Sequence, residues 1–431
     1  MISTILLLSL LGFLLLLTKQ YLMQGTAIRE IRLLGEDPEE VRAGTPLFLE
    51  RYSDLTGTRF SDSARVELLC NGDELFPRLF ADLRAARRLI ALQIFWYKPG
   101  KLADVLHDVL AERARAGVRV LVLLDYFGSY GLGEDYVRSL TAAGVEVAVY
   151  RPLRWETLYK VQQRSHVRAV VVDGCVGYTG GFGIDDDWSG DGRHPGQWRD
   201  THVRVEGPVV DRLQGAFVTN WAEATGDLLL GGGIFAREGG GDGGGDADVR
   251  RAGITFCSPS LGSTTAERAF VLTIAGARQR LYVTNAYFVP DENLRGLLCE
   301  AAGRGVDVRV LTPGLNTDRR SAYYAGRAHY EELLDAGVRI YEYEPTMVHA
   351  KTMVVDGAWS LVGTINFDTR SMALNEEVAL AVADERFAAR LEAVFLADLR
   401  HAKEVSAESL RGRSVFERMK ERAALLVAPL L

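Results

Sequence analysis

The chain has 431 residues, of which 48% are hydrophobic and 25% charged, and its formal net charge at pH 7 is −7. The composition is that of a globular protein, and the length exceeds that of one ordinary domain, which predicts two domains plus an anchor. The acidic excess argues against nucleic acid as the main partner, because proteins that bind nucleic acids usually carry a basic surface.

Cysteines and histidines give no sign of a metal site. The cysteines are few and scattered, without a CxxC pair, so we expect free thiols in a reducing cytoplasm and neither a zinc site nor a disulfide framework. Seven histidines include no HExxH pattern. The sequence therefore predicts no metal and no other cofactor. The cysteines are Cys70, Cys175, Cys257 and Cys299.

An apolar run from Ile2 to Leu17 opens the chain and predicts a membrane anchor helix. It would span about 24 Å of a hydrocarbon core of about 30 Å, so crossing it requires Tyr21–Met23 or local thinning of the bilayer. A cleaved signal peptide is the alternative, disfavoured because no cation precedes the run and no small-x-small cleavage site follows it. The cations Lys19, Arg29 and Arg32 follow the run, which predicts a cytoplasmic body by the positive-inside rule.

Strand and helix patterns alternate from Val66 onward, after a connector with mixed charge and two prolines. In the first half we expect strands at 89–96, 117–125 and 143–150, with a helix at 102–116. Such alternation indicates βαβ units and a mixed or parallel sheet covered by helices.

The second half repeats this order. Strands are expected at 281–288, 305–311 and 336–341, the last after a helix at 321–335. The repeat predicts two homologous domains packed face to face, with the functional site at their interface. A Gly-rich stretch between them predicts a flexible linker. The predicted divisions are an anchor at 1–25, a connector at 26–64, a first domain at 65–228, the linker at 229–250, a second domain at 251–405 and an amphipathic tail at 406–431.

The tail mixes cations with apolar residues and supports two interpretations. It is either a helix packed on the second domain or an amphipathic basic helix that lies on anionic lipid. Pro429 interrupts the pattern, and the sequence does not decide between the two.

One motif occurs twice with its spacing kept. His349, Lys351 and Asp356 stand in an HxKxxxxD pattern, and 349 − 166 = 183 residues upstream His166 opens the same pattern with Arg168 and Asp173. Because side chains alternate along a strand, the histidine and the cation of each copy share one face. A single copy is also compatible with a buried strand carrying a stray histidine. The exact repetition argues for chemistry, since a nucleophile and a phosphate-neutralising cation need this arrangement.

The paired motifs resemble the two HKD motifs of the phospholipase D superfamily, and the flanking residues narrow the resemblance to bacterial cardiolipin synthases. The similarity covers nearly everything after about residue 60. Its flanking segments are Trp198–His202, Glu206–Pro208, Tyr287–Asp291, Pro345–Lys351, Asn366–Ser371 and Asn375–Glu377.

The resemblance implies an α/β fold of two homologous phospholipase D-like domains, each a mixed β-sheet flanked by helices, with an N-terminal apolar helix. It also implies that one histidine attacks phosphorus while the other protonates the departing alcohol and deprotonates the incoming one. Neutral imidazole suits both roles. Family usage assigns attack to His166 and acid–base chemistry to His349, an order that the residues themselves do not fix.

The remaining members of the motifs have supporting roles in this resemblance. Lys351, Asn366 and Arg168 would bind the non-bridging phosphate oxygens. Asp173 and Asp356 belong to the catalytic motifs but lie too far along their strands to touch the histidines, so we expect them to stabilise the fold. Glu377 is a candidate to orient a histidine ring, although such a carboxylate could equally be a surface residue.

The first motif departs from the family pattern at two positions, because Arg168 replaces a lysine and Gly183 replaces an asparagine. Arginine is bulkier and forked, and glycine offers no side-chain donor, so a lost hydrogen bond would cost about 1–3 kcal/mol in the transition state. A slowed or altered enzyme and a lipid-binding remnant both fit these changes. Both histidines are present, which favours activity.

The predicted function is therefore that of a cardiolipin synthase-like phosphatidyltransferase. It moves a phosphatidyl group from phosphatidylglycerol to a second phospholipid alcohol through a phosphohistidine and releases glycerol. A phospholipase D-type hydrolase and a catalytically weak lipid-binding homologue are the alternatives. Expected partners are anionic phospholipids, namely phosphatidylglycerol and cardiolipin, and the membrane, without nucleic acid. The expected location is the cytoplasmic membrane with the catalytic domains inside, and the oligomeric state is not predicted.

Overall fold

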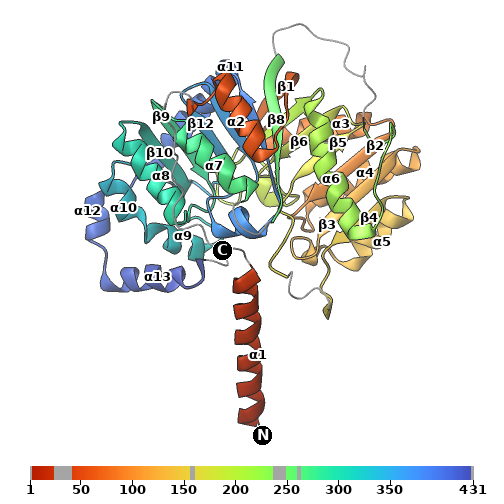
Figure 1. Cartoon of the computed structure of the whole chain (residues 1–431). Coiled ribbons are helices and arrows are strands. Elements are labelled where there is room, and N and C mark those ends of the chain that lie inside the picture. Colours follow the sequence, from red (N-terminus) through yellow and green to blue (C-terminus); the bar gives the residue numbers. More distant parts are fainter. Residues whose placement is uncertain (1, 24–40, 156–160, 236–248, 260–263, 429–431) are drawn as a thin grey trace.

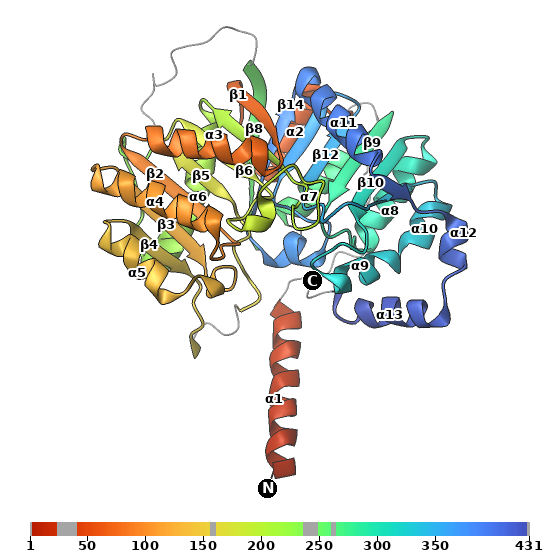
Figure 2. The same cartoon turned by 180° about the vertical axis from the view of Figure 1, so that it is seen from behind.

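The computed structural model describes residues 2–23, 41–155, 161–235, 249–259 and 264–428. Helix α1 (Ile2–Met23) projects as a single rod from an α/β body (Figures 1 and 2). None of the helices in these ranges combines the length and the apolar character needed to cross a membrane. The predicted anchor thus stays a prediction, and most of the predicted linker lies outside the described residues.

The body is built on one mixed sheet of 15 strands. From one edge to the other the order is β15-β11-β10-β9-β12-β13-β14-β8-β1-β7-β6-β5-β2-β3-β4. The strands of the first half are β1 (Phe60–Cys70), β2 (Leu89–Ile94), β3 (Arg119–Asp125), β4 (Glu146–Tyr150), β5 (Ala169–Val172), β6 (Val176–Gly180) and β7 (Thr201–Glu206). Those of the second half are β8 (Val249–Cys257), β9 (Arg280–Asn285), β10 (Asp307–Pro313), β11 (Arg339–Tyr343), β12 (Lys351–Val355), β13 (Trp359–Gly363), β14 (Glu377–Ala383) and β15 (Ala402–Glu404).

The two halves repeat one topology. Outward from the centre the first half runs β1-β7-β6-β5-β2-β3-β4 and the second β8-β14-β13-β12-β9-β10-β11, with β15 added at the edge. In each half the outer three of these strands are parallel and the rest antiparallel. The predicted strands all appear, within a few residues of their expected ends. The helix expected at 321–335 is instead two helices, α9 and α10, separated at Ala328–His329.

Helices cover both faces of the sheet (Figures 1 and 2). This explains why β2 is buried along its whole length and reads as a continuous apolar run. The helices are α2 (Pro46–Thr56), α3 (Asn71–Ala85), α4 (Lys101–Arg115), α5 (Glu134–Ala142), α6 (Val209–Thr225), α7 (Thr265–Ala275), α8 (Glu292–Gly303), α9 (Arg320–Arg327), α10 (Tyr330–Asp335), α11 (Glu385–Leu399), α12 (Ala407–Arg411) and α13 (Val415–Leu425). A π-helical turn, η6 (Arg370–Leu374), precedes β14.

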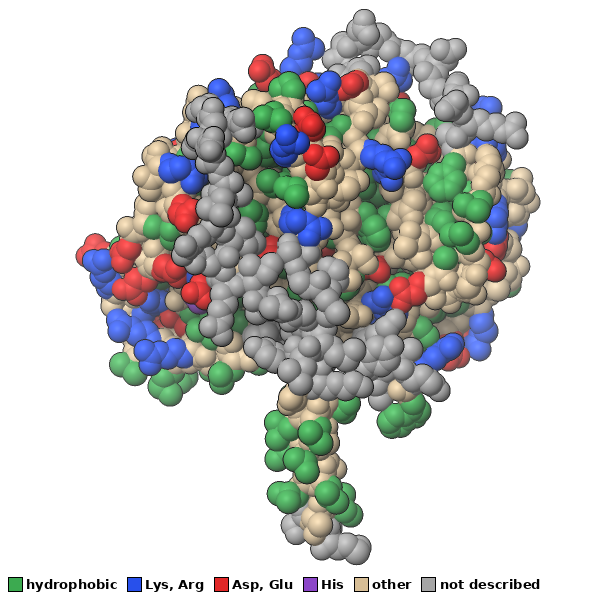
Figure 3. Space-filling model, viewed as in Figure 1, with side chains coloured by type: hydrophobic (Ala, Val, Ile, Leu, Met, Phe, Trp, Pro, Cys, Tyr) green, Lys and Arg blue, Asp and Glu red, His purple; other side chains and the backbone are tan. Residues whose placement is uncertain are grey.

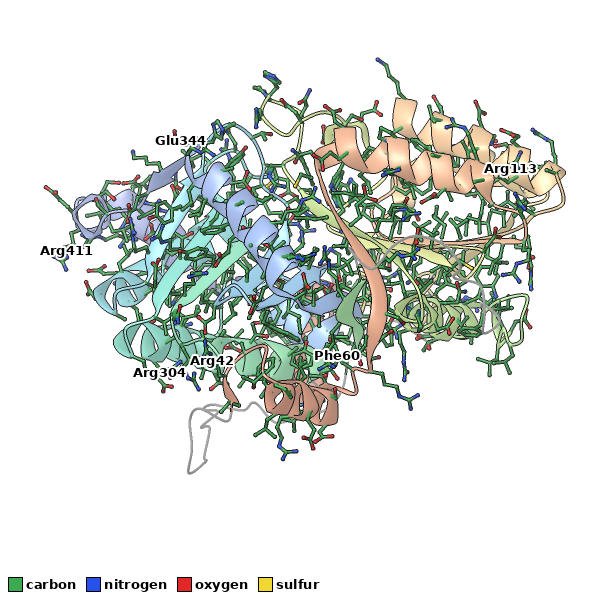
Figure 4. All side chains as sticks on the ribbon, turned by 90° about the horizontal axis from the view of Figure 1, so that it is seen from above. Arg42, Phe60, Arg113, Arg304, Glu344 and Arg411 are labelled. Atoms are coloured by element: carbon green, nitrogen blue, oxygen red, sulfur yellow. The ribbon has the colours of Figure 1, made fainter. Side chains whose placement is uncertain are left out.

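The halves meet edge to edge through β1 and β8, which pair antiparallel. Strand β13 also contacts β6 and β7, and β14 contacts β6, so part of the predicted face-to-face packing is present as well. One apolar core, which includes Val205, Phe217 and Leu380, is shared by both halves, and each half has a further core of its own. Seen from above, Phe60 at the start of β1 lies near the junction, whereas Arg113 and Arg411 lie at opposite ends of the body (Figure 4). The shared core makes the two halves one rigid frame for residues placed between them.

The topology places both motif histidines at one edge of the sheet. Strand β5 runs antiparallel to β2, with Ala169 opposite Gln93, so the segment before β5 lies at the carboxyl end of β2. In the same way Lys351 at the start of β12 lies opposite Asn285 at the end of β9. We call the side of the sheet at which β2, β3, β4, β9, β10 and β11 end the carboxyl edge. Open α/β sheets usually bind their ligands at such an edge.

Candidate active site

The two histidine segments are each held by the backbone of the opposite half. The backbone N–H of His166 donates to the carbonyl of Glu376 at 2.9 Å, and that of His349 donates to the carbonyl of Arg199 at 2.7 Å. Both side chains are almost enclosed, with 6% of His166 and 3% of His349 exposed. His166 and His349 are 183 residues apart in the sequence. Their motifs therefore meet at the junction of the halves.

His166 is oriented by a carboxylate from the second half. Its Nδ1 lies 3.0 and 2.9 Å from the two carboxylate oxygens of Glu377, which begins β14. The Thr364 hydroxyl and, at 3.4 Å, the Asn375 amide donate to the same carboxylate. Among the described residues none forms a hydrogen bond with Nε2 of His166. With Nδ1 on the carboxylate, Nε2 is the nitrogen available for attack.

His349 is oriented in the reverse direction, by a carboxylate from the first half. Its Nδ1 lies 3.1 Å from Oδ2 of Asp200, which directly precedes β7. The indole N–H of Trp188 donates to the same oxygen at 2.8 Å, and the backbone N–H of Thr201 donates to Oδ1 at 2.7 Å. The sequence analysis missed Asp200. Its position could have indicated it. Asp200 lies in the segment Trp198–His202, immediately before β7, and β7 is the strand of the first half that corresponds to β14.

The motif cations are buried beside their own histidines. Nζ of Lys351 lies 3.0 Å from Nε2 of His349, so this nitrogen accepts a hydrogen bond, whereas that of His166 has no partner in the part of the chain that the structure describes. The Arg168 guanidinium donates to the carbonyl of His166 at 2.9 Å and to that of Phe182 at 3.1 Å. The site thus holds two buried cations and two carboxylates around two imidazoles.

Burial governs the proton affinities of this cluster. It lowers the pKa of His166 well below its ordinary value, that of His349 to about 3 and that of Lys351 to about 7. Burial raises the pKa of Glu377 to about 8. Burial would also raise the pKa of Asp200, but the charges of His202, His349 and Lys351 and the hydrogen bond from His349 hold it well below its ordinary value. Both imidazoles are therefore neutral at pH 7 in the resting site.

Aromatic rings wall both imidazoles. Phe95 meets the ring of His166 edge-on at 5.2 Å between centroids. Trp188 and Trp198 contact the ring of His349 at 5.2 and 5.1 Å, and Tyr287 lies at 6.1 Å. These walls fix the rings and exclude bulk water, which strengthens every electrostatic interaction inside.

Asn366 lies beside this network rather than on a histidine. Its side chain is buried, its amide nitrogen lies 3.4 Å from the Ser371 hydroxyl, and its carbonyl oxygen has no partner in the described part of the chain. Ser371 also hydrogen-bonds to Glu377. Asn366 is thus connected through Ser371 to the carboxylate that holds His166.

Asp173 and Asp356 are not brought to the histidines. Each stands at the far end of its strand with positive φ, 54° and 52°. The carboxylate of Asp173 accepts from the backbone N–H groups of Arg87, Arg88 and Leu89, which lead into β2. Asp356 accepts from those of Arg278, Gln279 and Arg280 before β9 at 2.8–2.9 Å. Their place agrees with the expectation that these two members of the motifs stabilise the fold, because they tie the hairpin turns to the neighbouring strands.

Arg168 and Gly183, the two residues at which the first motif differs from the family pattern, lie close together, because Arg168 binds the carbonyl of Phe182 next to Gly183. A Cβ added at Gly183 would lie 2.9 Å from the carbonyl oxygen of Trp96 and 3.0 Å from the Trp188 ring. An asparagine would not fit there without movement of the backbone. Arg168 uses two of its nitrogens on backbone carbonyls, a pattern that a lysine could not reproduce. The surroundings of both positions therefore fit the residues that this chain has, glycine at 183 and arginine at 168.

No cluster of three or more potential metal ligands occurs within the described ranges. The predicted absence of a metal stays a prediction.

Comparison with known proteins agrees with this geometry. Residues 270–399 match the family described as "Cardiolipin synthase, PLD-like domain". The chain is 35% identical over 377 residues to the cardiolipin synthase of Geobacillus kaustophilus (strain HTA426), which covers 86% of this chain and 73% of the relative. It is 36% identical over 369 residues to cardiolipin synthase A of Pseudomonas fluorescens (strain SBW25), covering 85% and 75%. The chain belongs to the cardiolipin synthase family.

Solved structures share the fold. The phosphatidylserine synthase of Haemophilus influenzae Rd KW20 superposes with a TM-score of 0.68 at 14% identity, covering 89% of this chain and 99% of that one. A polyphosphate kinase from Porphyromonas gingivalis gives 0.55 at 12% identity, covering 84% and 52%. At these identities the likeness shows the fold alone. Membership in the cardiolipin synthase family confirms the resemblance seen in the motifs and makes the chain an enzyme of the phospholipase D superfamily.

Proposed function

We propose that the chain transfers a phosphatidyl group from phosphatidylglycerol to a hydroxyl of a second phosphatidylglycerol, forming cardiolipin and releasing glycerol. The two halves act as paired phospholipase D-like domains around one site. The observation that carries this proposal is the crossed pairing of His166 with Glu377 and of His349 with Asp200. In it, Nε2 of His166 has no hydrogen-bond partner within the described ranges, whereas Nε2 of His349 accepts from the Lys351 ammonium.

In the first step Nε2 of His166 attacks phosphorus. A phosphorus–nitrogen bond forms, the bond from phosphorus to the glycerol oxygen breaks, and that oxygen takes a proton from His349. Attack requires that Glu377 is ionised and that Nδ1 of His166 carries the proton. Arrival of an anionic phosphate raises the proton affinity of His349, so that it takes up a proton together with the substrate and serves as the acid, while Lys351 beside it keeps its own proton.

In the second step His349 removes the proton from the incoming hydroxyl, the new phosphorus–oxygen bond forms and the bond to His166 breaks. Lys351, Arg168 and Asn366 are proposed to stabilise the charge on the non-bridging oxygens in both steps. Buried cations suit this role because their interactions are not screened by water.

The proposal includes attachment to the cytoplasmic membrane, with the catalytic body on the cytoplasmic side. Its support is the exposed apolar run Ile5–Leu17 of α1, together with the cations that follow in the sequence. Nucleic acid is not proposed as a partner, in keeping with the acidic net charge.

A lipid mass-spectrometric assay tests the function. The purified full chain is incubated with phosphatidylglycerol in mixed micelles without added metal, beside His166→Ala and His349→Ala. Cardiolipin and glycerol in equal amounts from the wild type and from neither variant are the expected result. Phosphatidic acid in place of cardiolipin would mean that water is the acceptor and that the chain is a hydrolase. Absence of any product would favour a lipid-binding homologue.

A further inference from the structure

Helix α13 is packed with its apolar side outward. It faces α9 with Ala424 and Glu421, and the Glu421 carboxylate accepts a hydrogen bond from Arg413 at 2.6 Å and lies 3.7 Å from Arg327. A surface helix of a globular protein normally turns its apolar stripe to the core. Here the inner face is small, with Ala424 and the half-buried Leu425 in an apolar cluster with α9 beside the ion pairs of Glu421. The large apolar side chains on the opposite side remain in solvent.

The outward residues form one stripe flanked by cations. Val415, Met419 and Leu426 stand at i, i+4 and i+11, close to one face of the helix, and they are 77%, 61% and 83% exposed. Phe416 lies beside them, with Lys420 over its ring at 4.6 Å. Figure 3 shows hydrophobic side chains on the underside of this region with Lys and Arg side chains just above them. The flanking cations are Arg418, Lys420 and Arg422.

This stripe lies on the same side of the molecule as the histidines. Helix α13 contacts α9, which follows the carboxyl end of β10. Exposed apolar side chains also stand on the segments that leave the carboxyl ends of β3, β4 and β10. In the first half Trp155 is 88% exposed. These loop residues are Phe127, Tyr130, Leu153, Trp155 and Leu315.

We propose that the α13 stripe and these loop residues form a docking surface for a bilayer that contains anionic phospholipid. Apolar side chains with cations at their flanks match the acyl–headgroup boundary of such a bilayer, where aromatic residues and the charged ends of Lys and Arg side chains are favoured. The inference rests on the proposed function, because it turns the carboxyl edge and its two histidines toward the headgroups of the lipid substrate. A substrate phosphate then reaches His166 without its acyl chains leaving the bilayer.

Hydrogen–deuterium exchange tests the contact directly. The full chain is reconstituted into phosphatidylcholine vesicles with or without phosphatidylglycerol, and exchange is followed in peptides covering 411–428. We expect exchange several-fold slower with phosphatidylglycerol, and we expect Phe416→Ser/Met419→Ser to remove the difference. The matched control is Val105→Ser/Leu396→Ser, which changes two exposed apolar residues on α4 and α11. This variant should show the same difference in exchange as the wild type.

Turnover separates docking from chemistry. The turnover of the Phe416→Ser/Met419→Ser variant on phosphatidylglycerol in vesicles should fall about tenfold, because two apolar side chains that would be buried in the bilayer are missing. It should keep wild-type turnover on short-chain phosphatidylglycerol below its critical micelle concentration. Equal exchange with and without phosphatidylglycerol, or equal turnover of wild type and variant on vesicles, would overturn the inference.

A change in oligomeric state of the variant by light scattering, without a lipid effect, would also overturn it and assign the stripe to a second copy of the chain. Exchange protection in a wild type that forms no product would instead sink the proposed function and leave the docking surface standing.

Discussion

Glu377 of the second half holds Nδ1 of His166 of the first half at 2.9 Å, a contact between residues 211 positions apart in the chain. Asp200 of the first half holds His349 of the second in the reverse sense. Each motif histidine thus takes its carboxylate partner from the opposite half. Activity therefore depends on the junction between the halves, which the shared core and the pairing of β1 with β8 make rigid.

Removing the charge of Asp200 should disable His349. In Asp200→Asn the amide no longer stabilises a proton on the ring during acid catalysis, so we expect turnover to fall about 10²- to 10⁴-fold. Steady-state cardiolipin formation measures this, with Asp307→Asn, a partly buried aspartate at the start of β10, as the control. Turnover within threefold of wild type in a folded Asp200→Asn protein would contradict the role.

The nucleophile can be identified by trapping. Because Nε2 of His166 has no hydrogen-bond partner within the described residues while that of His349 accepts from Lys351, we expect the adduct on His166. His349→Ala should slowly accumulate a phosphatidyl–histidine at position 166, detectable by mass spectrometry of peptides kept at alkaline pH. His166→Ala should form none. An adduct on His349 in the His166→Ala protein would reverse the assignment.

The pH profile should be a narrow bell between about pH 7 and 8. Attack requires ionised Glu377, whose pKa burial raises to about 8, so kcat/KM rises with pH on the acid side. Charge stabilisation requires protonated Lys351, whose pKa burial lowers to about 7, so kcat/KM falls again as that proton is lost.

The variant Lys351→Arg keeps its charge to higher pH, so the alkaline limb should move upward, and the acid limb should then report the ionisation of Glu377 alone, near pH 8. An unchanged alkaline limb would show that Lys351 is not the group that titrates there.

Restoring the family pattern at position 183 should destabilise the protein. The Cβ of Gly183→Asn would meet the Trp96 carbonyl oxygen at 2.9 Å, so we expect a loss of about 1–3 kcal/mol in the free energy of unfolding. Urea denaturation measures it. Gly296→Asn, where a Cβ meets nothing within 4 Å, is the matched control.

Arg168→Lys should lower turnover, because one ammonium cannot reach both carbonyls that the guanidinium binds. Faster turnover of Arg168→Lys/Gly183→Asn would show instead that the natural residues impair the site.

Asp356→Ala should reduce stability more than chemistry. The carboxylate accepts three backbone hydrogen bonds at the entry to β9, and we expect a loss of about 2–3 kcal/mol in the free energy of unfolding. Turnover per folded molecule at low temperature should stay within a few-fold of wild type. A loss of activity as large as that of Asp200→Asn, without loss of stability, would return Asp356 to the catalytic group.

The sequence by itself determined the repeated motif, the α/β alternation of both halves and the identity of His166, His349, Lys351 and Glu377 as candidates. Periodicity reports which faces of strands and helices are buried, and exact spacing reports a repeated unit, so these features are local. The helix expected at 321–335 was missed in detail, since a break after Arg327 leaves no strong signal in the pattern.

Only the tertiary structure decided which carboxylate serves which histidine. Contacts between residues 149 and 211 positions apart depend on how two halves join, and no local pattern encodes that. The structure also showed which backbone groups Asp173 and Asp356 bind, which the expectation that they stabilise the fold had left open. The outward stripe of α13 was equally hidden, because an amphipathic pattern predicts two faces but not which of them is buried. The contacts of Glu421 and Ala424 with neighbouring elements decide that.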